Sequence, residues 1–205
     1  MHPARDFREV DRAELTARVG ERGFALIVGT ANRRPLVAHA PVLLAGERLR
    51  FHLSAANPLA SALAQSGWAL VAITGEDAYV SPDWYGLADQ VPTWNYVSVE
   101  VEGPTRVLTR GETTVLLDDL SARYEADLAP KLRWSRAKMA AGRFEAMLNG
   151  IVGFEVAVER LEGITKLSQN KPAEAIARVA AELANRDDEG ARRIARRMVR
   201  HLQEG

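Results

Sequence analysis

The first half of the chain alternates between short apolar runs and clusters of turn residues, a pattern typical of β-structure. Residues 48–54 show it most clearly, because three apolar side chains alternate with Arg50, His52 and Ser54. Such alternation predicts a half-buried β-strand. Further strands are predicted over residues 24–29, 35–44, 68–74, 78–85 and 93–103, with a turn at residues 75–77. Because the links between strands are short, an antiparallel barrel is favoured over a parallel sheet.

The hydrophobic period changes near residue 112 from two to about 3.6 residues, the period of a helix. Helices are predicted over residues 12–22, 59–66, 112–125, 134–148, 172–184 and 190–203, and one more strand over residues 150–160. We therefore expect an α+β protein that is mainly β. Its β-barrel domain would cover residues 1–171 with inserted helices at about 112–148. Residues 172–205 would form a C-terminal helical extension packed on the same domain.

Composition excludes several classes of function. Of the 205 residues, 47% are apolar, which is enough for a sizeable core. Lys and Arg number 27 and Asp and Glu also number 27, so the formal net charge is zero and a general polyanion-coating role is disfavoured. The chain has no cysteine, which excludes disulfides and thiolate metal sites. Glycine-rich nucleotide fingerprints, a P-loop and a His-Glu-x-x-His zinc motif are also absent.

No targeting or membrane segment is evident in the sequence. The first residues contain no apolar stretch of the kind found in signal peptides. The longest charge-free stretch, residues 51–75, includes His52, Asn57 and Pro58 and makes a poor membrane span. We therefore expect a soluble, cytoplasmic protein.

Three groups of residues are candidates for binding chemistry. Residues 94–96, Trp-Asn-Tyr, begin a strand and suit stacking on a planar ring or a partner subunit, unless the chain's own helices cover them. Residues 166–171, Lys-Leu-Ser-Gln-Asn-Lys, could hold a phosphate or carboxylate, or could form a solvated turn that caps the next helix. His39 and His52 lie on neighbouring predicted strands and could line one cleft, or each could be a half-buried histidine with satisfied hydrogen bonds.

Several of these segments resemble a known family. Pro-Thr-Trp-Asn-Tyr at residues 92–96, Lys-Leu-Ser-Gln-Asn at 166–170 and Gly-Ile-Val-Gly-Phe at 150–154 closely resemble the PaiB-type family of FMN-binding negative transcriptional regulators. The resemblance covers essentially the whole chain. It implies a split β-barrel like that of pyridoxamine-phosphate-oxidase-type flavoproteins, a homodimer with FMN in clefts between the two chains, and repression of genes. The FMN-binding residues that it implies are His39, Pro41, His52, Ser54, Asn57, Trp94, Asn95, Tyr96, Lys166, Ser168, Gln169 and Asn170.

Three departures from the family pattern bear on FMN affinity. Leu59 and Ala60 stand where the family usually has Gln-Trp, Glu100 stands where it tends to have histidine, and Asp83 stands where a small residue is usual. The lost Gln-Trp pair and the two added carboxylates are expected to weaken binding of an anionic flavin phosphate.

The DNA surface of a regulator is best sought in the last predicted helix. Residues 190–205 contain five arginines against one glutamate, and such a basic stripe could meet phosphates. The same helix has an apolar stripe, so a helix docked on the barrel with its arginines in water is the alternative. The predicted DNA contacts are Arg193, Arg196, Arg197 and Arg200.

Three alternative functions stay open at this point. They are a flavin-dependent oxidoreductase without direct DNA binding, a barrel that binds haem or another planar ligand, and an interaction module without a ligand.

Overall fold

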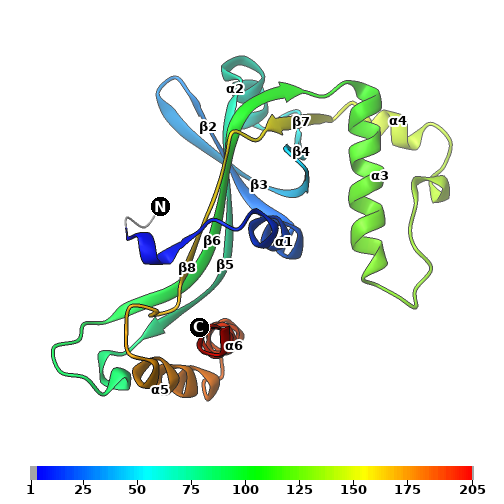
Figure 1. Ribbon diagram of the computed structural model, residues 1–205. Coiled ribbons are helices and arrows are strands. Elements are labelled where there is room, and N and C mark those ends of the chain that lie inside the picture. The colour runs from blue at the N-terminus through cyan, green and yellow to red at the C-terminus, as the bar shows by residue number, and fades with distance from the viewer. Residues whose placement is uncertain (1–3, 205) are drawn as a thin grey trace. The chain divides into compact units, whose positions relative to one another are not determined.

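The computed structural model describes residues 4–204 and contains eight strands and six α-helices in that part of the chain (Figure 1). The strands are β1 (Arg8–Glu9), β2 (Phe24–Ala31), β3 (Arg34–Ala45), β4 (Arg48–Ser54), β5 (Trp68–Val80), β6 (Thr93–Val107), β7 (Ile151–Ala157) and β8 (Arg160–Lys166). The α-helices are α1 (Arg12–Arg22), α2 (Pro58–Ser66), α3 (Arg110–Ala126), α4 (Arg143–Leu148), α5 (Ala173–Ala184) and α6 (Glu189–Glu204).

The strands are hydrogen-bonded in the order β1-β8-β6-β5-β2-β3-β4-β7, and β6 also pairs with β7. The pairs β1–β8, β2–β3, β2–β5, β3–β4, β4–β7 and β6–β7 are all antiparallel. The predicted α+β class with antiparallel strands is therefore confirmed. The predicted helix over residues 12–22 and the predicted strand over 48–54 begin and end at the expected residues.

The chain forms two compact units. Unit 1 consists of Met1–Leu15, Thr74–Val99 and Glu162–Gly205, and unit 2 of Thr16–Ile73 and Glu100–Leu161. Unit 2 therefore contains β2, β3, β4, β7 and the helices α2, α3 and α4. Unit 1 contains β1, α5 and α6.

The core of unit 2 is built by alternating side chains of its strands. Phe51 of β4 and Phe154 of β7 are paired in register and fully buried, with stacked rings whose centroids are 5.4 Å apart. Gly103 is required in β6 because a Cβ there would overlap the carbonyl of Ala157. Helix α3 docks through a second apolar cluster, formed by Leu108, Leu116 and Leu120 with Leu43 packed against it.

The predicted helix over residues 134–148 is wrong over most of its length. The structure has only a short 3-10 turn at Arg136–Lys138, and α4 is limited to Arg143–Leu148. The apolar positions of residues 134–141 are mostly alanines, which bury little surface against a neighbouring element. Gly142 adopts a left-handed φ of 75°, which no helix interior can contain.

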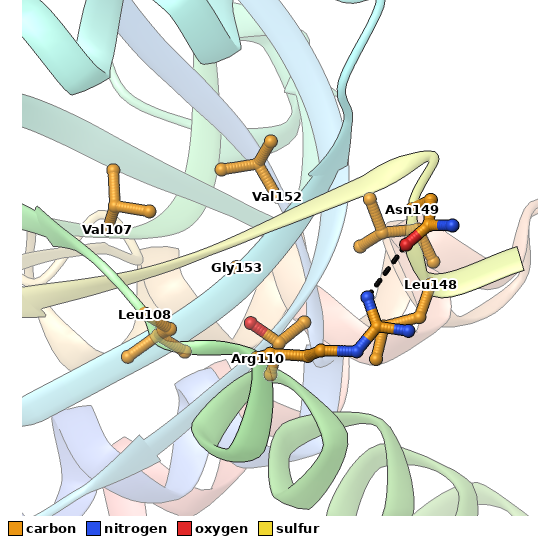
Figure 2. Close-up of a pocket in the computed structure, with 9 residues that line it drawn as sticks. Val107, Leu108, Arg110, Leu148, Asn149, Val152 and Gly153 are labelled. Atoms are coloured by element: carbon orange, nitrogen blue, oxygen red, sulfur yellow. Dashed lines mark hydrogen bonds between the residues drawn. The ribbon is translucent and has the colours of Figure 1, made fainter. Parts of the chain in front are cut away.

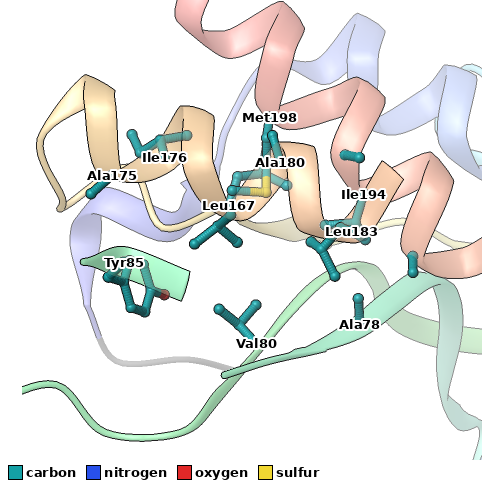
Figure 3. Packing of buried hydrophobic residues seen from close by; sticks show 13 residues of the cluster. Ala78, Val80, Tyr85, Leu167, Ala175, Ile176, Ala180, Leu183, Ile194 and Met198 are labelled. Atoms are coloured by element: carbon teal, nitrogen blue, oxygen red, sulfur yellow. The ribbon is translucent and has the colours of Figure 1, made fainter. Parts of the chain in front are cut away.

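In unit 1, helices α5 and α6 pack together over the end of β5 (Figure 3). Ala78 and Val80 of β5 contact a cluster that includes Leu183 of α5 and Met198 of α6, all of them buried. The apolar stripe predicted for the last helix is thus buried against α5. Helix packing, and not helix propensity alone, stabilises this region.

The predicted turn at residues 75–77 is also wrong, because β5 continues without interruption from Trp68 to Val80. Gly75 allows the close approach of a neighbouring strand instead. A Cβ at this position would overlap the side chain of Val97 and lie 3.0 Å from its carbonyl oxygen. A lone glycine inside an apolar run indicated a turn from sequence, whereas the structure uses it for packing.

Candidate functional site

Five of the predicted FMN-binding residues lie in unit 2. His39 and Pro41 alternate with buried residues of β3, and His52 and Ser54 alternate with buried residues of β4. Because side chains alternate across a strand, all four project from the outer face of the sheet. The structure therefore places both histidines on one face of adjacent strands.

The outer face of β3 is exposed and carries an aromatic pair. The ring of His39 stacks on that of Phe24 in β2, with centroids 6.2 Å apart and planes inclined by 20°. Pro41 is paired with Phe24 in the β2–β3 register and is half-buried. These flat side chains form a surface on which a planar ring could stack.

His52 has an unusual environment. It pairs with Gly153 of β7, and its Nδ1 atom is buried without a hydrogen-bond partner among residues 4–204. Burial also lowers the pKa of His52 below its ordinary value of 6.5. Helix α3 is held to the same strand by an ion pair of 2.9 Å between Arg50 and Asp119. A buried imidazole nitrogen without a partner marks a place where an enclosed water molecule could donate a hydrogen bond.

Ser54 and Asn57 lie at the start of α2. The side chain of Asn57 caps the helix by accepting a hydrogen bond of 2.9 Å from the backbone N–H of Leu59. Ser54 is exposed, and its hydroxyl accepts a bond of 3.3 Å from the N–H of Ala56. Helix N-termini favour anions, so a phosphate group is suited to this end of α2.

The pKa of His52 leads to a testable pH dependence. Since the folded state has the lower pKa, the unfolded state binds the proton more tightly, and stability present above pH 6.5 is lost as the pH falls toward the folded pKa. Urea unfolding near neutral pH and at about pH 5 should show that His52→Gln reduces this acid-induced loss. His39→Gln, which changes an exposed ring on the same sheet face, is the matched control and should leave the loss in place. Equal effects of the two variants would contradict the prediction.

The other predicted FMN-binding residues lie in unit 1, where Lys166 has a defined position. Its ammonium donates hydrogen bonds to the hydroxyl of Thr93 and, over 2.7 Å, to the carbonyl of Trp94. It also lies 5.8 Å from the ring centroid of Phe7. Burial lowers the pKa of Lys166 from its ordinary value.

Asn95 and Ser168 are buried and bonded to each other. The amide of Asn95 donates to the Ser168 hydroxyl over 3.1 Å, and that hydroxyl also lies 2.7 Å from the hydroxyl of Tyr85. The Asn95 amide further contacts the sulfur of Met198 at 3.6 Å. Ser168 has a left-handed φ of 63°. In this structure both residues fix the loop that follows β8, and their contact with a cofactor stays a prediction.

The remaining members of this group differ in exposure. Trp94 is 54% exposed and meets Tyr79 edge-on at 6.0 Å, while Tyr96 is half-buried. Gln169 is held by the backbone, since its amide donates to the carbonyl of Asp6 over 3.1 Å. Asn170 is exposed. Among the predicted residues of unit 1, Trp94 and Asn170 therefore present the most accessible side chains.

The arginines of α6 are largely engaged in ion pairs. Arg193 and Arg196 contact Glu189 at 3.1 and 2.9 Å, and Arg197 contacts Glu76 at 3.2 Å. Hydrogen bonds from the α6 arginines, led by that of Arg193, lower the pKa of Glu189 to about 2. The two carboxylates of Glu189 and Glu76 thus offset part of the positive charge on which the predicted DNA surface depends. Arg200, the fourth predicted DNA contact, is exposed near the end of α6.

The departures from the family pattern at Glu100 and at Leu59-Ala60 have local explanations. Glu100 forms an ion pair of 3.1 Å with Arg160, so its carboxylate is compensated within unit 2. Leu59 and Ala60 are buried on the inner side of α2 and contribute to packing.

A pocket in unit 2 was not predicted from the sequence (Figure 2). Its volume is about 340 Å³, and it lies where β6 leads into α3 and where β7 begins. Arg110 lies along one side of the pocket. Its guanidinium donates a hydrogen bond of 2.7 Å to the side-chain oxygen of Asn149 and one of 2.8 Å to the carbonyl of Glu145. Gly153, which pairs with His52, also lines it. The segment 150–154 belonged to the resemblance, but no local pattern identified Arg110.

Over residues 4–204, none of the helices is long and apolar enough to cross a membrane. In the same range, no group of three or more His, Cys, Asp or Glu side chains could hold a metal ion.

Comparison with known proteins identifies relatives over most of the chain. The family model described as "Putative FMN-binding domain" matches residues 1–160. Protease synthase and sporulation protein PAI 2 of Bacillus subtilis is 28% identical over 207 residues, covering 99% of this chain and 99% of that protein. The predicted resemblance to the PaiB-type FMN-binding family is thereby confirmed.

Solved structures with the same fold include flavin-binding proteins. The FAD and haem binding protein from Mycobacterium smegmatis has a TM-score of 0.61 at 19% identity, covering 83% of this chain and 78% of that chain. The flavocytochrome Anf3 from Azotobacter vinelandii has a TM-score of 0.60 at 14% identity, covering 80% and 72%. At these identities the likeness shows the fold, and it agrees with the predicted split barrel.

Proposed function

The chain belongs to this family of FMN-binding domains, and on that premise we propose that it works as an FMN-binding homodimer whose cofactor contacts the outer sheet face of unit 2. The observation that carries the proposal is the grouping of His39, Pro41, His52 and Ser54 on one sheet face, with Asn57 at the adjoining start of α2. His39 and Ser54 are the exposed members of this group, whereas Nδ1 of His52 is buried by the chain itself.

The side chains on this face fit the chemistry of FMN. The stacked rings of His39 and Phe24 offer a flat surface for an isoalloxazine ring. The Ser54 hydroxyl and the N-terminus of α2 suit a phosphate. FMN exchanges electrons when bound, and the protein contributes position and electrostatics.

The second copy is proposed to cover an apolar part of the same face. Val28 of β2 is paired with Val37 of β3 and with Leu70 of β5, and all three alternate with buried residues. Val37 is 52% exposed. A twofold interface brings one patch onto itself, so a flat apolar patch is well suited to it. The interface would adjoin His39, the neighbour of Val37 on the outer face.

A carboxylate placed at Ser54 is expected to weaken FMN binding. In Ser54→Glu the added charge would repel the flavin phosphate, raising the Kd for FMN at least about tenfold, which corresponds to about 1.4 kcal/mol. Fluorescence titration with FMN measures this. Gln65→Glu is the matched control, because Gln65 is exposed in the last turn of α2, away from its N-terminus, and the substitution adds the same charge. If Ser54→Glu bound FMN as tightly as Gln65→Glu, the phosphate would not lie at this end of α2.

Lys166 is proposed as a separate FMN contact, since its ammonium supplies a positive charge for an anionic cofactor. Lys166→Met should lower FMN affinity, whereas Lys171→Met, which removes another lysine of the same loop, serves as the control. Unchanged affinity in Lys166→Met would remove this residue from the site.

A role in gene regulation is the second candidate function, and the observation that favours it is the exposed stretch at residues 127–143 of unit 2, which carries five basic residues against one acidic residue. The ion pairs of Arg193, Arg196 and Arg197 make α6 the weaker choice for a DNA surface.

A further inference from the structure

The chain from the end of α3 to the first residue of α4, residues 127–143, is the most exposed internal stretch of unit 2, and we call it the basic segment. Every residue in it is exposed except Met139, which is half-buried. It contains five basic residues against one acidic residue, a net charge of +4 in a chain whose total formal charge is zero. Its only regular structure is the short 3-10 turn at Arg136–Lys138, and connections this long are uncommon in compact domains. Its basic residues are Lys131, Arg133, Arg136, Lys138 and Arg143.

Two of these cations hold the segment against α3. Lys131 pairs with Glu125, whose carboxylate also accepts a hydrogen bond of 2.7 Å from the backbone N–H of Trp134. Arg136 contacts Asp118 at 3.1 Å. The segment therefore runs back beside α3 toward α4 in a fixed course (Figure 1).

The other three cations, Arg133, Lys138 and Arg143, are exposed and form no ion pair within 4 Å of any residue in the range 4–204, although Lys138 contributes to lowering the pKa of Glu125. Trp134 lies among them and is 38% exposed. The segment thus combines cations free of a direct ion pair with an accessible aromatic ring, in contrast to Arg193, Arg196 and Arg197 of α6.

We propose that the basic segment binds the phosphate backbone of a nucleic acid, with Arg133, Lys138 and Arg143 as phosphate contacts and Trp134 as a stacking surface for an unpaired base. Nucleic-acid binding at this segment rests on the second candidate function, gene regulation, and does not depend on FMN binding. Cations attract a polyphosphate over several ångströms, and a tryptophan face stacks on any base. An anionic membrane is the competing partner. It is disfavoured because Leu128, Leu132 and Trp134 lie in irregular backbone and do not form the apolar face of an amphipathic helix.

The test is fluorescence anisotropy of the full-length protein with labelled random-sequence oligonucleotides, one duplex and one single-stranded. We expect binding at low salt that weakens steeply as salt rises. The triple variant Arg133→Glu/Lys138→Glu/Arg143→Glu should bind at least about 100-fold more weakly near 0.1 M salt, with the salt slope reduced by about three. Trp134→Ala should lose roughly tenfold with the single strand and little with the duplex.

The matched control reverses the charge of three exposed arginines elsewhere in the chain and changes the net charge by the same amount as the segment variant. It is Arg5→Glu/Arg22→Glu/Arg34→Glu. Circular dichroism and thermal melting establish that each variant is folded. If the control variant lost as much oligonucleotide affinity as the segment variant, general electrostatics would govern binding and the proposal would be overturned. No binding by the wild-type protein at low salt would also overturn it.

Two further measurements need no variant. Trypsin should cleave the free protein within the basic segment, and the bound oligonucleotide should protect those sites while cleavage elsewhere continues. When vesicles of anionic phospholipid are sedimented in the presence of the protein, the protein should stay in the supernatant. Co-sedimentation with vesicles without oligonucleotide binding would identify a membrane partner and overturn the proposal.

Discussion

Replacing Val37 by glutamate is expected to convert the proposed dimer into a folded monomer. Val37 is 52% exposed in the single chain, so the substitution should change the free energy of unfolding of the monomer little. In the dimer the new carboxylate would be buried without a partner beside the Val28–Leu70 patch. Because burying an unpaired charge costs several kcal/mol per ion, the dimer Kd should rise at least about 1000-fold. Sedimentation equilibrium measures this directly.

Val115→Glu is the matched control for this prediction. Val115 is 53% exposed on α3, so the chemical change and the starting exposure are the same. The control should remain dimeric. A dimeric Val37→Glu protein would place the interface on another surface, and a monomeric wild-type protein would contradict the proposed dimer.

Truncating Leu116 to alanine should destabilise the protein by about 2–5 kcal/mol. Leu116 is fully buried where α3 docks on unit 2, so the substitution leaves a cavity as well as removing apolar contacts. The melting temperature should fall by roughly 5–15 °C. The loosened α3 should also reduce FMN affinity, since this helix is held to the strand that carries His52 by the Arg50–Asp119 pair.

Leu132→Ala removes the same atoms from a side chain that is 85% exposed in the basic segment. Its effect on the free energy of unfolding should stay within about 0.5 kcal/mol. Comparable losses in the two variants, measured by urea unfolding, would contradict the assignment of Leu116 to the docking contact of α3.

The sequence was most informative where one side-chain period dominated. Residues 48–54 alternate strictly, and β4 begins and ends at the predicted residues because each inward side chain is buried in the unit 2 core. The error at residues 75–77 arose because a glycine that admits Val97 cannot be distinguished by sequence from one in a turn. The error at residues 134–148 arose because alanine spacing resembles a helical stripe but buries too little surface to fix a helix.

The candidate site was predictable in residue type more than in arrangement. Asn95 and Ser168 are far apart in sequence, and only the fold shows that they bond to each other within unit 1. The arginines of α6 formed a basic stripe in the sequence, but Glu189 and Glu76 engage several of them. The buried Nδ1 of His52 depends on α3 and β7, which lie far along the chain, and alternation alone could not reveal it.

The most direct test of the central proposal is gel filtration of the protein after incubation with FMN, with flavin absorbance and molar mass recorded together. We expect FMN to co-elute with the protein at one flavin per chain, and we expect the eluting species to have the mass of a dimer. Protein that elutes without flavin, while free FMN appears in the small-molecule fraction, would contradict the proposal.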